Sequence, residues 1–166
     1  MVQETCLCGS NIPSEACCNS IINGVAIAAT PEQLMRSRYT AFCLRNVDYL
    51  TDSHHSSKRQ SDDKLILSRH INDTQWLGLR VIQSGIDSSN PNKGFVEFIA
   101  YYTEAANTIS NTQSSDVKQL HEYSLFVREN GQWFYLSGDR MPPIKFQRND
   151  FCWCNSGKKI KKCHGC

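Results

Sequence analysis

The middle of the chain first shows hydrophobic residues at helical spacing. Thr30 can cap a helix, Pro31 fits its first position and Gln33 sits where a capping box needs it. Apolar residues then follow one helical face to about residue 50. They are Leu34, Met35, Tyr39, Phe42, Cys43 and Leu50. The pattern predicts one long helix from residue 31 to about residue 50, followed by a polar loop and a shorter helix over about 62–72.

The pattern becomes strand-like after residue 75. Residues 76–84 and 94–104 are rich in β-branched and aromatic residues, and the turn-rich sequence DSSNPNKG joins them. Residues 106–116 contain few core-forming residues and predict a mobile loop. Residues 118–129 and 132–138 flank Asn130-Gly131, a strong hairpin signal. Helices followed by four antiparallel strands define an α+β fold.

Composition narrows the class of protein. The chain has 166 residues, of which 40% are hydrophobic and 20% charged, so we expect one main folded domain with small appendages. The net charge of +2 gives no reason to expect bulk nucleic-acid binding. The sequence contains no apolar run typical of a signal peptide or a membrane span. We therefore expect a cytoplasmic protein without membrane insertion.

Cysteines gather near both ends with the same spacing. The first cluster is Cys6, Cys8, Cys17 and Cys18, and the second is Cys152, Cys154, Cys163 and His164. Both read C-x-C-x8-C-[C/H], with histidine replacing cysteine at the fourth position. Closed zinc sites accept thiolate or imidazole at one position, whereas a disulfide cannot use histidine. The spacing predicts two zinc ions, each in a closed structural site with no position left for substrate.

Other readings of the cysteines remain open. An iron–sulfur centre is one, although the C-x-C pair does not match the usual ferredoxin spacing. Chance thiols and a redox sensor that releases zinc on oxidation are others. Cys166 could replace His164 as the fourth ligand. Cys43 lies on the apolar helical face and is expected to be a buried core thiol.

The C-terminal sequence CWCNSGKKIKKCHG resembles the SEC-C motif, a zinc knuckle found at the C-terminus of the SecA preprotein translocase ATPase. The N-terminal copy keeps the cysteines, Gly9 and Ser10 but lacks the Gly-Lys and basic residues. A SEC-C motif at each end, with TPEQLMRSRYTAF and HEYSLFVRENGQWFYLSGD between them, resembles the YchJ family. The resemblance implies a middle domain similar to nuclear transport factor 2 (NTF2), a cone of helices on a curved antiparallel sheet. It implies no activity.

These observations predict three parts. They are an N-terminal knuckle over residues 1–22, an NTF2-like domain over 30–140 and a C-terminal knuckle over 148–166. The N-terminal knuckle, whose charged side chains are acidic, is expected to pack on the middle domain or on a partner.

Four lysines distinguish the C-terminal knuckle. Lys158, Lys159, Lys161 and Lys162 cannot ligate a metal that softer donors already hold, so the knuckle would display them as a positive surface. The simplest interpretation is that the lysines only keep the protein soluble. The functional one is docking on an acidic partner, and the resemblance to the translocase motif implies an acidic chaperone or the ribosome. Direct sequence-specific recognition of nucleic acid is not expected, because the sheet aromatics lack interleaved basic residues.

A second hypothesis places function in a pocket of the middle domain, as an enzyme or a small-ligand binder. The candidate pocket residues combine carboxylates, a histidine and arginines on the long helix and two strands. They are Arg36, Arg38, Glu97, His121 and Glu122. A carboxylate beside a histidine could serve in general acid–base catalysis, but alternation with apolar residues is more typical of a solvent-facing strand. No catalytic residue is assigned.

Overall fold

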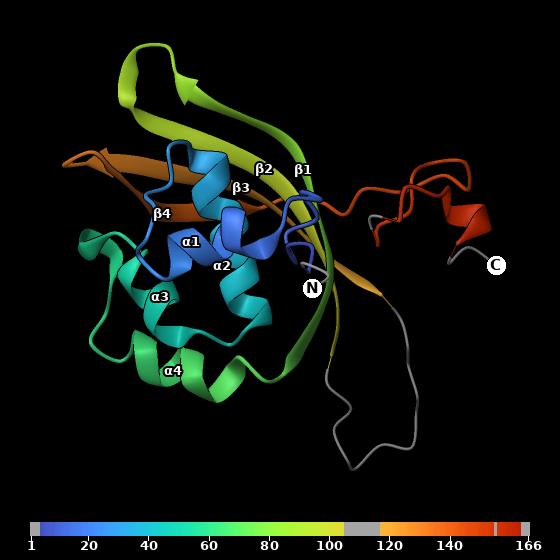
Figure 1. The fold of residues 1–166 in the computed structure, drawn as a ribbon, viewed down its shortest axis with the longest axis horizontal. Coiled ribbons are helices and arrows are strands. Elements are labelled where there is room, and N and C mark those ends of the chain that lie inside the picture. Colours follow the sequence, from blue (N-terminus) through green and yellow to red (C-terminus); the bar gives the residue numbers. More distant parts are fainter. Residues whose placement is uncertain (1–3, 105–116, 155, 164–166) are drawn as a thin grey trace.

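The protein is described by a computed structural model that covers residues 4–104, 117–154 and 156–163. Helices pack on one face of a curved four-stranded antiparallel sheet, and the C-terminal segment lies beyond the opposite face (Figure 1). The helices are α1 (Cys18–Ile22), α2 (Pro31–Cys43), α3 (Val47–Asp52) and α4 (Asp63–His70), with short 3-10 turns η1 (Ser14–Ala16), η2 (Ser56–Lys58) and η3 (Ile160–Lys162). The strands are β1 (Thr74–Asp87), β2 (Asn90–Glu104), β3 (Lys118–Glu129) and β4 (Gln132–Arg140), paired in sequence order.

Helix α2 begins as the sequence predicts but ends early. The Thr30 hydroxyl accepts the backbone N–H of Gln33 at 3.1 Å, and Pro31 occupies the first turn. The single long helix predicted to about residue 50 is wrong, because Arg45 adopts a left-handed φ of 58° and breaks it. Asn46 then caps α3 by accepting the N–H of Tyr49 at 3.0 Å. Asparagine is a favoured N-cap, so this residue carried the signal for a second helix start.

The strands are longer than the pattern predicts. β1 runs to Asp87 and β2 already begins at Asn90, so most of the predicted link belongs to a hairpin. The second hairpin turns at Asn130 and Gly131, whose φ angles of 49° and 82° suit the tight turn that Asn-Gly favours. The mobile loop predicted over 106–116 lies outside the described residues.

Alternation along the strands gives the sheet two different faces. On the helix-facing side, Val96, Phe98 and Phe126 share one buried cluster with Leu34 of α2 and Trp133 of β4. The residues that alternate with these along β2 and β3 point to the opposite, outer face of the sheet. The core therefore lies between α2 and the sheet.

The segment after β4 folds back across the outer face. His121 Nδ1 lies 2.7 Å from the carbonyl oxygen of Pro142. The side chain of Gln119 makes two hydrogen bonds to the backbone of Ile144, at 3.1 and 3.2 Å. The Tyr101 ring lies 5.9 Å from the rings of both Phe146 and Trp153. We call residues 141–147 the strap, because they hold the C-terminal knuckle against the sheet.

One glycine permits this close approach. A Cβ at Gly78 of β1 would collide with the backbone carbonyl of Trp153. Backbone cannot move aside as a flexible side chain can, so the position requires glycine. Within the described residues, no helix is both long and apolar enough to span a membrane.

Candidate metal centres

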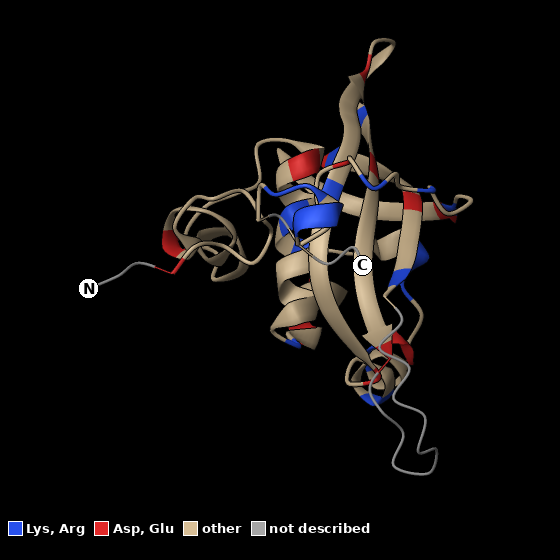
Figure 2. Ribbon diagram, turned by 90° about the vertical axis from the view of Figure 1, so that its right-hand side faces the viewer, with Lys and Arg blue, Asp and Glu red and all other residues tan. Residues whose placement is uncertain are grey.

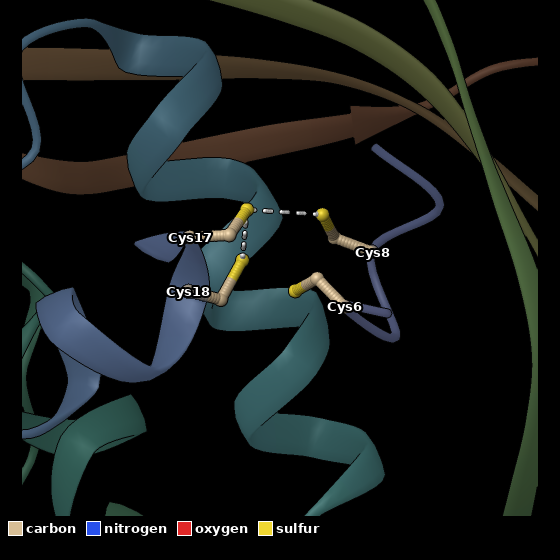
Figure 3. A group of neighbouring side chains, drawn as sticks. All are labelled: Cys6, Cys8, Cys17 and Cys18. Atoms are coloured by element: carbon tan, nitrogen blue, oxygen red, sulfur yellow. Dashed lines mark hydrogen bonds between the residues drawn. The ribbon is translucent and has the colours of Figure 1, made fainter. Parts of the chain in front are cut away.

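The N-terminal cysteines converge through a tight turn and a short helix. The backbone N–H of Cys6 donates to the carbonyl of Ile12 at 2.8 Å, and Gly9 turns the chain with a φ of 76°. The 3-10 turn η1 then delivers Cys17 and Cys18 to the start of α1. The sulfur atoms of Cys6, Cys8, Cys17 and Cys18 all lie within 4.8 Å of one another (Figure 3).

The C-terminal knuckle repeats this backbone position by position. The bridge between Thr5 and Pro13 recurs between Phe151 and Lys159. The hydrogen bond from Cys6 recurs from the N–H of Cys152 to the Lys158 carbonyl at 2.7 Å. The turn η3 corresponds to η1 and again precedes a cysteine. The sulfur atoms of Cys152, Cys154 and Cys163 also lie within 4.8 Å of one another. The repeated spacing therefore produces a repeated three-dimensional motif.

The sulfur separations fit metal ligation. The sulfur of Cys17 lies 3.7 Å from that of Cys8 and 3.8 Å from that of Cys18. A tetrahedral zinc site with Zn–S bonds of about 2.3 Å has ligand–ligand edges of about 3.8 Å. A disulfide needs sulfurs about 2.0 Å apart, and none of the eight described cysteines forms one. Both cysteine groups can hold a metal ion.

Hydroxyl groups support the sulfur atoms in both copies. Ser10 Oγ lies 3.3 Å from the sulfur of Cys17, and Ser156 Oγ lies 3.3 Å from that of Cys163. Such donors orient ligands and offset thiolate charge. The sequence carried this signal, since serine follows the C-x-C pair at the same distance in both clusters, although no role was predicted for either serine.

Hydrogen bonds among the N-terminal thiols shift the pKa values of Cys6 and Cys18 in opposite directions. Interaction with the thiols of Cys18 and Cys8 lowers the pKa of Cys6. Hydrogen bonding with the thiol of Cys6, and to a smaller extent with that of Cys8, raises the pKa of Cys18. Metal binding to this group must therefore displace protons.

Burial separates the two centres. The side chains of Cys6, Cys8 and Cys18 belong to the same buried cluster as Leu34 and Tyr39. In the C-terminal group Cys152 is buried outside that cluster, Cys154 is half-buried and Cys163 is exposed. The N-terminal centre therefore lies mostly in the main core, whereas the C-terminal centre lies outside that core and is more open to solvent.

Two further predictions concern the fourth ligand of the C-terminal knuckle and the burial of Cys43. His164 and Cys166 lie outside the described residues, so the choice between them stays a prediction. Cys43 is half-buried rather than fully buried, and it packs against the main core. Burial raises the pKa of Cys43 to about 11, which keeps it a thiol at neutral pH.

The five predicted pocket residues do not meet in one place. Glu97 and His121 lie on the outer face, where His121 Nε2 is 2.8 Å from a Glu97 carboxylate oxygen. The strap covers this pair, leaving the two side chains 15% and 6% exposed. The amide of Gln83 also donates to Glu97. Hydrogen bonds from Gln83 and His121 lower the pKa of Glu97, so the carboxylate is charged and held in place.

Arg38 and Glu122 lie on the helix-facing side instead. Arg38 donates to the carbonyl of Leu50 at 2.8 Å and to the Ser53 hydroxyl, and its guanidinium lies 4.7 Å from the Tyr135 ring centre. Burial lowers the pKa of Arg38 to about 10, which still leaves it charged. Glu122 accepts hydrogen bonds from Ser124 and Tyr135. These polar groups have partners and brace the interior.

Arg36 belongs to neither group. It donates to the carbonyl of Cys8 at 2.9 Å and pairs with Glu32 one turn earlier, also at 2.9 Å. It therefore ties the N-terminal knuckle to α2. In the described part of the chain, a cavity of about 300 Å³ opens beside Leu34, Tyr49 and Trp133, and none of the five predicted residues lines it.

All four lysines of the C-terminal knuckle are exposed. In Figure 2, η3 is largely blue and lies in front of the sheet, while the N-terminal segment carries red. Among the described residues, no carboxylate lies within ion-pair distance of Lys158, Lys159, Lys161 or Lys162.

The fold and the two cysteine groups define an NTF2-like α+β protein with a potential metal knuckle at each end. The family model described as "YchJ, middle NTF2-like domain" matches residues 30–138, and the SEC-C motif matches residues 148–165. The chain belongs to the YchJ family.

Two solved structures share this architecture. One is the solution structure of RPA3114, a SEC-C motif containing protein from Rhodopseudomonas palustris. It is 29% identical with a TM-score of 0.71, over 84% of this chain and 100% of that one. The other is the crystal structure of a SEC-C motif containing protein from Psychrobacter arcticus. It is 25% identical with a TM-score of 0.63, over 98% and 96% of the two chains.

Proposed function

We propose that this protein is a cytoplasmic adaptor that binds two zinc ions and docks through its basic C-terminal knuckle on an acidic macromolecular partner. The eight proposed ligands are the cysteines of the two groups together with His164. Zinc supplies the folding energy of each knuckle and takes no part in a reaction.

The donor set and its geometry support zinc. Four thiolates, or three with an imidazole, form the ligand sets of closed structural zinc sites. The observed sulfur spacing near 3.8 Å suits that ion without rearrangement. Among the described residues no cysteine forms a disulfide, which is typical of a protein in a reducing compartment such as the cytoplasm.

The exposed lysines carry the docking proposal. They project from a knuckle whose backbone a metal would fix, and the strap holds that knuckle against the sheet. A fixed display of like charges attracts an acidic surface such as a ribosome or an acidic chaperone. The N-terminal knuckle has the same backbone but lacks the lysines, so we assign it a stabilising role.

Co-sedimentation of the protein with ribosomes purified from the organism that encodes it tests the proposal. A variant carrying Lys158→Glu, Lys159→Glu, Lys161→Glu and Lys162→Glu should lose binding while it retains two zinc ions per chain. Lys58→Glu with Lys93→Glu changes exposed charges away from the knuckle and serves as the control. Binding by the quadruple variant at physiological salt would contradict docking through the lysines, because the electrostatic contribution should dominate this contact.

The alternative function, a ligand binder or enzyme using a pocket of the middle domain, gains no support from its five predicted residues. They lie on two faces of the sheet and beside the N-terminal knuckle, and their polar groups are already paired.

A further inference from the structure

The C-terminal knuckle displays an exposed aromatic ring among its lysines. Phe151 is 69% exposed, and it is the only exposed Phe, Tyr or Trp among the described residues. The nearby Trp153 is half-buried and packs against Tyr101. In the described part of the chain no other aromatic ring pairs with Phe151.

The backbone pairs this ring with a cation. Phe151 and Lys159 face each other in an antiparallel bridge, which places their side chains on the same side. The N–H of Lys161 donates to the Arg148 carbonyl at 3.1 Å, so a second lysine lies beside an arginine. An exposed ring is thus flanked by positive charges on a short hairpin.

One acidic residue, Asp150, lies among the basic residues of this surface. The Asp150 carboxylate accepts the backbone N–H of Gln147 at 2.8 Å, and it is half-buried. Arg80, on the adjacent sheet, lies over the Phe146 ring at 5.4 Å. The charge around Phe151 is therefore predominantly positive.

Resting on the docking proposal above, we propose that the acidic partner is single-stranded RNA, with Phe151 stacking on an unpaired base and Lys159 and Lys161 contacting phosphates. An acidic protein needs only the lysines, because carboxylates offer no π-face for the ring. A flexible single strand offers a π-face and a phosphate at every nucleotide, and aromatic stacking tolerates any base. The structure thus adds to the sequence an aromatic interleaved with basic residues, which is typical of single-strand binding.

Fluorescence anisotropy of the full zinc-loaded chain tests this proposal. The probes are a labelled oligouridylate of about twelve nucleotides and a labelled polyglutamate peptide of equal charge. Phe151→Ala should raise the Kd for the oligouridylate about tenfold and leave the weak affinity for polyglutamate unchanged. Phe151→Trp should restore binding. Val25→Ala, which shortens another highly exposed side chain, should have no effect.

Salt dependence separates the charge contribution from the stacking one. For single strands, the slope of log K against log salt is about −0.7 for each phosphate neutralised. Lys159→Glu with Lys161→Glu should therefore reduce the magnitude of the slope by at least about 1.4, whereas Phe151→Ala should leave the slope unchanged. The absorption of a cobalt-substituted knuckle verifies that each variant keeps its thiolate ligation.

The outcomes distinguish this inference from the docking proposal. Strong lysine-dependent binding of polyglutamate without oligouridylate binding would overturn the RNA assignment and leave docking intact. Equal oligouridylate binding by wild type and Phe151→Ala, or equal dependence on Phe151 for a duplex RNA, would overturn base stacking. Failure to bind either probe or ribosomes would overturn both proposals.

Discussion

The two knuckles show how one backbone motif can serve two physical purposes. Their bridges, turns and serine-to-sulfur contacts correspond position by position. Yet three of the four N-terminal cysteines belong to the main core, whereas the C-terminal group lies on the other side of the sheet with Cys154 half-buried and Cys163 exposed. The N-terminal motif therefore contributes to the core, whereas the C-terminal motif exposes four lysines. The surroundings of the two motifs, rather than their cysteine spacing, distinguish them.

Removing one ligand from each centre should give the largest difference. Cys8→Ser changes a fully buried proposed ligand in the main core, so it should lower the free energy of unfolding by about 4 kcal/mol or more. Cys154→Ser should unravel only the C-terminal knuckle and leave the main unfolding transition unchanged. Urea denaturation followed by tryptophan fluorescence, with zinc content measured in parallel, checks both. Equal destabilisation by the two variants would contradict the assignment of different purposes.

Detaching the C-terminal knuckle without changing it should have an intermediate effect. Gly78→Ala places a methyl group against the Trp153 carbonyl, and we expect a cost of about 1–3 kcal/mol in docking of the knuckle to the sheet. Amide hydrogen exchange should show reduced protection over residues 141–154 with the core unchanged. Gly85→Ala is the matched control on the same strand, because its methyl meets only the end of the Phe95 ring. Unchanged exchange in Gly78→Ala would mean that the strap alone holds the knuckle.

The smallest expected effect concerns the pair beneath the strap. The folded pKa of Glu97 lies below its ordinary value of 4.5, so the carboxylate stabilises the fold above that pH. This contribution is lost as the pH falls through the folded pKa. Glu97→Gln should therefore lower stability at pH 7 by about 1 kcal/mol and flatten the loss of stability below pH 4.5. Thermal unfolding at pH 3.5 and pH 7 measures the difference, and parallel curves for wild type and variant would exclude a role for this charge.

Local signals explain why much of the architecture could be predicted. Thr30 and Pro31 mark the start of α2, and Asn130-Gly131 marks the turn of the second hairpin. The two cysteine spacings each bring sulfur atoms together. Each of these features depends on residues close in sequence. The break at Arg45 and Asn46 was also local, but the apolar residues on both sides continued the helical pattern and concealed it.

The amino-acid sequence by itself determined the α+β order, the family and the ligand spacing of both knuckles, because periodicity and short-range turn chemistry encode them. Only the tertiary structure decided which knuckle is buried, that Glu97 and His121 lie on the opposite face from Arg38 and Glu122, and that Phe151 is exposed beside Lys159. These properties depend on which surfaces pack together over long separations in the chain. The strap fixes one such surface and leaves the basic hairpin facing solvent.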